Sequence, residues 1–317
     1  MSGIDRRGLA GLLAAGALFP KLARAQTPPP LALMTAGQGS AFLPYGQGIA
    51  QVVTKAGVAR IDVKESKGSN ENLDAVDASA STLGTAFLGS AYDALGGTGF
   101  AAGHKHANVR ALFPMYETAF MVATLKSRSL PNLLSLDGKK VGCGPAAGPA
   151  EGYFRAAAEI AGITPIVVGG TPADQGRQLI AGEIDAFWQG AIVPIPSLVA
   201  VTNVEDCTVF GLDNREAAAM RQRFPFMTEL IVAADTYRGQ TAPLTSVAAW
   251  NMVVAHKDLP EATAYAVTKA VLSSKDLIQL VGAPGGSTKA RNAEVNKVVP
   301  YHPGAVRALA EMGVKVE

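Results

Sequence analysis

Residues 31–56, LALMTAGQGSAFLPYGQGIAQVVTKA, predict a short strand, a glycine-rich turn and a helix. The apolar run Leu31–Met34 fits a buried strand, and the small polar residues after it fit a tight loop. Pro44 is tolerated in the first turn of a helix, and apolar residues recur at helical spacing from Ile49 onward. A loop that leads into a helix in this way directs unpaired backbone N–H groups and the positive end of the helix dipole at one point. The stretch therefore predicts a carboxylate or phosphate site, although such units are also ordinary elements of α/β folds.

The composition is that of a folded protein with little net charge. Of the 317 residues, 48% are hydrophobic and 17% are charged, which is enough apolar material for two lobes with separate cores. The formal net charge is +2, but most of the excess positive charge lies in the first 25 residues. Because the rest of the chain is close to neutral and carries no basic stripe, we expect no nucleic-acid partner.

Residues 1–25 predict an export signal. Arg6 and Arg7 open the segment, Gly8–Phe19 is an apolar run, and Ala23-Arg24-Ala25 is a small-residue cleavage site. The apolar run is shorter than the roughly 20 residues that a membrane-spanning helix requires. The arginine pair and the weakly hydrophobic core favour a twin-arginine signal, with a general secretory signal as the alternative. We therefore expect the mature chain in the periplasm.

Strand-like apolar runs alternate with helical patterns through most of the remaining chain. One such unit is a strand at Ala59–Val63, a polar loop, and a helix from Asn70 to about Ser79 for which Ser69 is a suitable N-cap. This alternation predicts an α/β fold with parallel sheets covered by helices. Ligands of such sheets bind beyond the carboxyl ends of the strands.

The chain is expected to pass between two lobes after the first such series. Val109–Met115 and Ala119–Leu125 predict two strands with little between them, and Val247–Val254 predicts a strand long enough to return to the first lobe. The expected division is lobe 1 from residues 31–118 plus 243–317 and lobe 2 from residues 119–242.

Cysteines, histidines and sequence motifs provide little support for an enzyme. Cys143 and Cys207 lie in apolar strand-like runs, so buried thiols are favoured over the disulfide that export would allow. The segment that contains His104 and His106 is predicted to be a surface turn, and no acidic residue lies near it at metal-ligand spacing in the sequence. The motifs of nucleotide-binding loops, hydrolase elbows and zinc proteases are absent from the sequence. We therefore expect no metal, no cofactor and no catalysis.

Small polar residues recur at the ends of five predicted strands, in both halves of the chain. These loops are Thr35–Ser40, Ser66–Asn72, Phe87–Ser90, Gly144–Ala150 and Trp188–Gly190. If the halves are lobes, the loops face each other across a cleft, and their hydroxyl, amide and backbone N–H groups suit binding. The residues expected to bind the ligand are Gln38, Ser40, Phe42, Tyr45, Ser66, Gly68, Ser69, Asn72, Phe87, Ser90, Ala147, Trp188 and Gln189.

Several of these residues are equally consistent with a structural role. Helix capping is the alternative for Ser69 and Asn72, and core packing is the alternative for Phe42 and Phe87. Lys67 is interpreted as a solvated loop residue in preference to an anion ligand.

Several stretches carry the pattern of a known family: Thr35–Gly46, Ser66–Leu73, Tyr92–Ala94, Gly97–Phe100, Gly182–Trp188, Lys257–Pro260 and His302–Ala305. They resemble the TAXI group of TRAP-transporter solute-binding proteins, and the similarity runs from about residue 35 to residue 313. The resemblance implies a two-lobed type II periplasmic-binding-protein fold with the ligand cleft between the lobes. It also implies a monomeric receptor that delivers a small organic acid to a TRAP membrane permease.

The sequence departs from that family at three positions expected near the ligand. Phe42-Leu43 replaces a tyrosine pair, Phe87-Leu88-Gly89 replaces Gln-Ser-Asp, and Ala147-Gly148-Pro149 replaces Ser-Gly-Thr. A polar ligand would leave its own groups unpaired there, at about 1–3 kcal/mol each. We therefore predict that glutamate is not held in the usual way. An aromatic or aliphatic acid is expected instead, with its carboxylate on backbone N–H groups and with Phe42, Phe87 and Trp188 around its body.

Two other functions remain open at this level. One is a ligand sensor for a signalling partner, and the other is an enzyme on the same two-lobed fold. Such an enzyme would need a cofactor cysteine, a phosphate loop or clustered carboxylates, and the sequence displays none of these.

Overall fold

The computed structural model describes residues 30–37, 40–146 and 148–316. The predicted export signal and two residues expected to bind the ligand, Gln38 and Ala147, lie outside these ranges. The helices are α1 (Phe42–Lys55), α2 (Ser69–Ala78), α3 (Leu88–Gly96), α4 (Pro149–Ala161), α5 (Pro172–Ala181), α6 (Pro196–Val204), α7 (Asn214–Arg223), α8 (Glu261–Leu272), α9 (Leu277–Val281) and α10 (Pro303–Glu311). The strands are β1 (Leu31–Met34), β2 (Ile61–Lys64), β3 (Thr82–Phe87), β4 (Val109–Leu125), β5 (Lys140–Gly142), β6 (Ile166–Val168), β7 (Ala186–Ala191), β8 (Cys207–Phe210), β9 (Thr228–Val232) and β10 (Leu244–His256).

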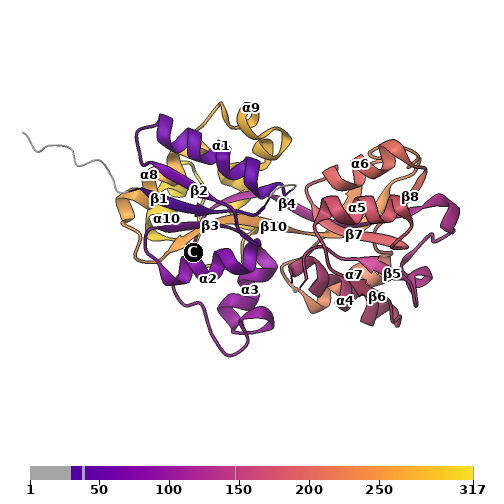
Figure 1. Cartoon of the computed structure of the whole chain (residues 1–317). Coiled ribbons are helices and arrows are strands. Elements are labelled where there is room, and N and C mark those ends of the chain that lie inside the picture. Colours follow the sequence, from indigo (N-terminus) through magenta and orange to yellow (C-terminus); the bar gives the residue numbers. More distant parts are fainter. Residues whose placement is uncertain (1–29, 38–39, 147, 317) are drawn as a thin grey trace, which may run out of the picture.

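Two lobes lie side by side and are joined by two long strands (Figure 1). The first lobe contains β1, β2 and β3 in parallel, with helices α1–α3 and α8–α10 around them. The second contains β5, β6 and β7 in parallel, together with β8, β9 and helices α4–α7. The strands β4 and β10 run antiparallel to each other and belong to both lobes. The expected α/β fold with two lobes is therefore confirmed.

Strand β4 is one continuous element of 17 residues, whereas the sequence predicts two strands. Its residues up to Ala119 pair with β10, and those from Ala119 to Leu125 pair with β7 and β8. At about 3.3 Å per residue, such a strand spans roughly 55 Å, enough to cross from one lobe to the other. The polar residues Glu117 and Thr118, which separate the two predicted strands, remain in the ladder because β10 pairs with them.

Each lobe has its own hydrophobic core. The first core includes Leu33, Ile49 and Leu83, so the apolar face predicted for α1 packs on the strand that precedes it. The second lobe has cores on both faces of its sheet, around Phe154 on one face and Leu198 on the other. Separate cores allow each lobe to keep its shape if the lobes move relative to each other.

Both cysteines are free and buried, as the sequence predicts. Burial raises the pKa of the Cys207 thiol to about 11 and also raises the pKa of Cys143. Both thiols are therefore protonated at neutral pH, which makes them poor nucleophiles.

The lobes contact each other through aromatic side chains on one side. Phe87, at the end of β3, packs edge-on against Phe120, Tyr153 and Phe226, with ring centroids 5.8, 5.4 and 6.2 Å away. Gly89 allows this close approach, because a Cβ there would lie 1.9 Å from the Tyr153 hydroxyl oxygen.

We predict that Gly89→Ala destabilises the protein by about 1–3 kcal/mol, because the added methyl group overpacks the contact between the lobes. Gly152→Ala is the matched control, since Gly152 is exposed on α4 and a Cβ there meets nothing within 4 Å. The control should gain up to about 1 kcal/mol from the loss of glycine flexibility. Urea denaturation of both variants tests this, and equal stability would contradict the proposed contact.

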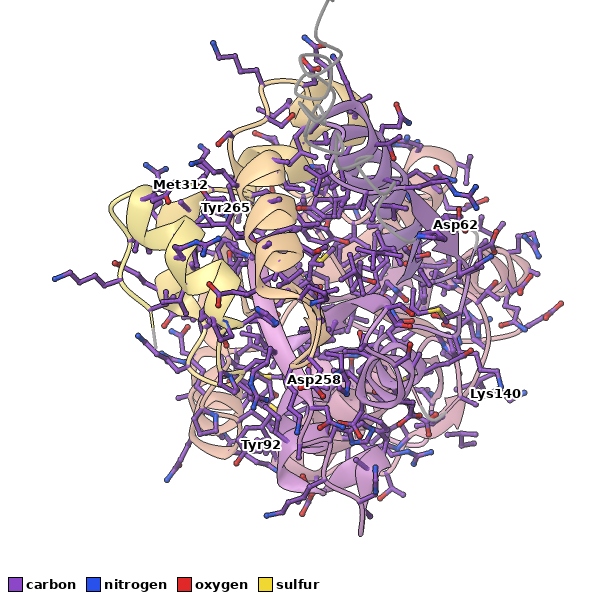
Figure 2. All side chains as sticks on the ribbon, turned by 90° about the vertical axis from the view of Figure 1, so that its left-hand side faces the viewer. Asp62, Tyr92, Lys140, Asp258, Tyr265 and Met312 are labelled. Atoms are coloured by element: carbon purple, nitrogen blue, oxygen red, sulfur yellow. The ribbon has the colours of Figure 1, made fainter. Side chains whose placement is uncertain are left out.

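Helix α10 packs against α8 at the far end of the first lobe. Figure 2 shows Tyr265 on α8 beside Met312 at the end of α10. His302 is the N-cap of α10, and its ring Nδ1 accepts a hydrogen bond of 3.2 Å from the backbone N–H of Gly304. Only 2% of His302 is exposed, and burial lowers its pKa below the ordinary value.

We predict that His302 makes the folded protein less stable in acid. The unfolded chain takes up this proton near the ordinary pKa of about 6.5, whereas the folded protein resists it. The free energy of unfolding should therefore fall as the pH drops below about 6.5, the ordinary value in unfolded chains. Urea midpoints between pH 8 and pH 5 measure this for the wild type and for His302→Asn, which keeps a good cap. An unchanged slope in His302→Asn would exclude His302 as the cause.

Candidate ligand-binding cleft

A cleft of about 380 Å³ opens between the two lobes. Its first-lobe residues are Ala36, Gly37, Ser40, Ala41, Phe42, Ser66, Lys67, Gly68, Ser69 and Phe87. Its second-lobe residues are Pro145, Gly148, Pro149, Ala150, Thr171, Pro172, Gln189, Gly190, Ala191, Pro196 and Ser197. The crossing strands β4 and β10 contribute Tyr116, Thr118, Phe120 and Asn251.

The structure brings seven of the sequence-predicted residues together in this cleft. They are Ser40, Phe42, Ser66, Gly68, Ser69, Phe87 and Gln189, and they come from both lobes. The other described ones, Tyr45, Asn72, Ser90 and Trp188, are buried and do not line it. The meeting of loops from opposite halves therefore agrees with the prediction, whereas these four side chains lie elsewhere.

Trp188 packs beneath residues that line the cleft and does not line it itself, although the sequence analysis expects its side chain beside the ligand. Its ring stacks on Phe120 at 5.4 Å and 13°, and its Nε1 donates a 3.0 Å hydrogen bond to the carbonyl oxygen of Ala150. Successive side chains of a strand point to opposite faces, so Gln189 lines the cleft while its neighbour Trp188 is buried. Trp188 thereby holds both Phe120 and the first turn of α4.

Tyr45 and Ser90 are also buried outside the cleft. The Tyr45 hydroxyl shares a short hydrogen bond with Thr288, and its ring packs edge-on against Tyr116 at 5.5 Å. Tyr45 thus supports Tyr116, which does line the cleft. Ser90 lies in the first turn of α3 with 2% of its surface exposed.

Asn72 joins the loops that follow β1 and β2 to strand β3. Its Nδ2 donates to the carbonyl oxygens of Thr35, at 2.6 Å, and of Thr85, at 2.8 Å. Its Oδ1 accepts a 2.6 Å hydrogen bond from the hydroxyl of Ser66. Because Ser66 lines the cleft, Asn72 positions the loop without contacting the cleft itself.

Ser69 is not the N-cap of α2, which is the alternative that the sequence leaves open. The cap is Gly68, in a left-handed conformation with φ of +111° that favours glycine. The Ser69 hydroxyl instead accepts a 3.0 Å hydrogen bond from the backbone N–H of Phe87. It therefore joins the start of α2 to the end of β3.

Five helices from both lobes begin at the cleft. The first residues of α1, α2, α4, α5 and α6 are all cleft residues. In the described chain, α2, α4 and α6 have no side-chain cap. The positive ends of their dipoles favour an anion.

The charge of the cleft favours an anion as well. Lys67 is the single charged residue among the described cleft residues, and no aspartate or glutamate is among them. Lys67 is exposed, as the sequence interpretation expects, but it also lies at the cleft.

The sequence interpretation missed the floor of the cleft. Tyr116, Thr118 and Asn251 lie inside long strands, where the pattern indicates only core. The one available signal was Asn251, an amide within an otherwise apolar run.

The fold and the cleft together define a class. Two lobes joined by crossing strands, with the cleft between them, form the fold of the periplasmic binding proteins. MatC from Rhodopseudomonas palustris with bound malate has a TM-score of 0.56 at 14% identity, over 90% of this chain and 95% of that one. The periplasmic binding protein BugD has a TM-score of 0.56 at 10% identity, over 89% and 93% of the chains. A second R. palustris protein, with adipate, has a TM-score of 0.54 at 13% identity, over 90% and 96%.

Residues 33–313 match the NMT1-like family, and the chain belongs to that family. In the part that the structure describes, no helix is both long enough and apolar enough to cross a membrane.

We predict that Asn72→Ala destabilises the protein by about 1–3 kcal/mol, because the carbonyl groups of Thr35 and Thr85 lose the buried Asn72 amide as a donor. Ser66→Ala is the matched comparison, since it removes one hydroxyl from the same network and leaves the Asn72 donors in place. Urea denaturation should show a clearly smaller loss for Ser66→Ala. Equal losses of stability in the two variants would mean that the Asn72 amide does not hold these two loops against β3.

Proposed function

We propose that this protein is a periplasmic receptor that captures a small organic acid between its lobes and delivers it to a TRAP-type membrane permease. The observation that carries the proposal is the meeting of helix N-termini from both lobes in a cleft without described carboxylates. Such a cleft attracts an anion from solution and binds it without altering it.

Contacts from both lobes would couple binding to closure. A ligand held by α2 on one side and by α4 or α6 on the other stabilises the arrangement in which those helices are close. We place the hinge where β4 and β10 pass from one lobe to the other, near residues 117–119 and 235–248, with lobes of residues 31–118 plus 243–317 and of residues 119–242. The register of these two strands shifts between Trp250 and Met252, at the same crossing.

The body of the ligand would lie against aromatic rings. Phe42, Phe87, Phe120 and Tyr116 line the cleft, whereas Trp188 acts through Phe120. This lining supports an acid with an apolar carbon body, as expected from the departures at Phe42 and Phe87. Related folds were solved with malate and with adipate, and both of these ligands are small carboxylates.

The delivery step rests on the resemblance to the TAXI group and on export to the periplasm. A permease of the TRAP type would be the partner, and the receptor itself would need no nucleotide or metal. Restored uptake of the ligand by membrane vesicles that contain the permease, on addition of the purified receptor, is the direct test of this step.

We predict that carboxylates, and not cations, raise the melting temperature of the purified protein. Malate, adipate and benzoate are the anionic probes, glutamate is the carboxylate expected to stabilise least, and arginine amide is the cationic control. A ligand that binds only the folded form at 100 times its Kd adds about 2.7 kcal/mol of stability. Stabilisation by arginine amide alone, or by none of the compounds, would contradict the proposal.

We further predict that Lys67→Gln weakens binding of the best carboxylate by about two- to fivefold, since exposed charges contribute little. The effect should shrink as the salt concentration rises. Lys64→Gln is the matched control, because Lys64 is also exposed but lies outside the cleft. Equal effects of the two substitutions in calorimetry would show that Lys67 has no specific role.

A further inference from the structure

Asn251 lies at an irregularity in the pairing of the two crossing strands. Trp250 pairs with Glu117 and Met252 pairs with Pro114, so the single residue Asn251 faces two residues of β4. This is a β-bulge whose extra residue lies on β4, so the regular alternation is interrupted at Met115 and Tyr116, opposite Asn251. Asn251 is fully buried and is part of the cleft floor.

The orientation of the Asn251 amide follows from its neighbours. Its Nδ2 lies 2.8 Å from the carbonyl oxygen of Tyr116 and 2.8 Å from the hydroxyl oxygen of Thr118. A carbonyl oxygen accepts only, so the NH₂ group must face Tyr116 and the amide oxygen must face elsewhere. That oxygen, Oδ1, has no hydrogen-bond partner among the described residues.

Gln189, from the second lobe, repeats this arrangement in the same cleft. Its Nε2 donates to the carbonyl oxygen of Gly190 at 3.3 Å, and 9% of its surface is exposed. Its Oε1 is likewise buried without a partner in the described chain. Two buried acceptors, one from the second lobe and one from the floor of the cleft, are thus left without donors in the described chain.

Buried polar atoms without partners are rare, and each costs about 1–3 kcal/mol. A carboxylate cannot satisfy these atoms, because it accepts hydrogen bonds and would be repelled by the amide oxygens. The groups that fit are hydrogen-bond donors, either O–H or N–H.

We propose that the amide oxygens of Gln189 and Asn251 select an organic acid that carries a hydrogen-bond donor, such as a hydroxyl group, at a distance from its carboxylate. The carboxylate binds the helix N-termini, and the donor binds the amide oxygens. This inference rests on the proposed function and narrows its ligand class from organic acids to hydroxylated or amide-bearing acids.

Matched pairs of acids test the selection. Succinate and malate, benzoate and 4-hydroxybenzoate, and hexanoate and 6-hydroxyhexanoate each differ by one hydroxyl group at a different position. In at least one pair that binds, we expect calorimetry to show that the hydroxylated acid binds at least about tenfold more tightly than its unhydroxylated partner. This ratio corresponds to about 1.4 kcal/mol. Equal affinities within every pair that binds would overturn the inference and leave the proposed function intact. Absence of binding by all six acids would overturn both.

Two substitutions assign the preference to the amide oxygens. Gln189→Met keeps the length of the side chain and removes the acceptor, and Asn251→Leu does the same on the floor. Each should reduce the preference for the hydroxylated acid over its partner acid to under about threefold. Gln51→Met, on the exposed surface of α1, is the control and should keep the full preference.

Asn251→Leu also removes the bonds to Tyr116 and Thr118, so its folding is checked by thermal denaturation. Gln189→Met loses only a local bond of 3.3 Å and provides the test independently of that check. A preference that survives in folded Gln189→Met and folded Asn251→Leu would exclude the amide oxygens as its source.

Discussion

The antiparallel pairing of β4 with β10 is the constraint on which the rest of the structure depends. The two strands share one ladder from Val109 to Ala119, and each then continues into the sheet of the second lobe. Main-chain hydrogen bonds therefore join lobes that otherwise have separate cores. The cleft lies over this junction, so the residues of its floor belong to neither lobe alone.

The chemistry of the cleft comes mainly from the main chain. Parallel strands in each lobe end toward the junction, and the helices that follow them begin there, which gathers their N–H groups from two directions. Side chains contribute shape and orientation. Asn72 and Ser69 hold the loops of the first lobe, and Trp188 holds the start of α4.

Two of the positions at which the sequence departs from the TAXI pattern that it resembles lie at the cleft. Phe42 and Phe87 line the cleft, and Phe87 also packs against the rings of the second lobe. The same ring therefore lies beside the ligand space and forms part of the contact between the lobes. In the proposed function, the helix N-termini donate hydrogen bonds to the ligand. The amide oxygens of Gln189 and Asn251 accept hydrogen bonds from it.

Local patterns in the sequence predicted most of the helices and strands, the loops at their ends and the buried free cysteines. These features depend on periodicity, glycine and short polar runs, which act over a few residues. Tertiary structure alone decided which side chains reach the cleft. Trp188 and Gln189 are adjacent, yet only one lines it, because the strand faces are assigned by packing against Phe120 and α4. Ser69 bonds to the N–H of Phe87, 18 residues away, and Asn251 bonds to Tyr116, 135 residues away. Partners so distant along the chain are brought together only by the assembled sheet, so no local pattern could specify them.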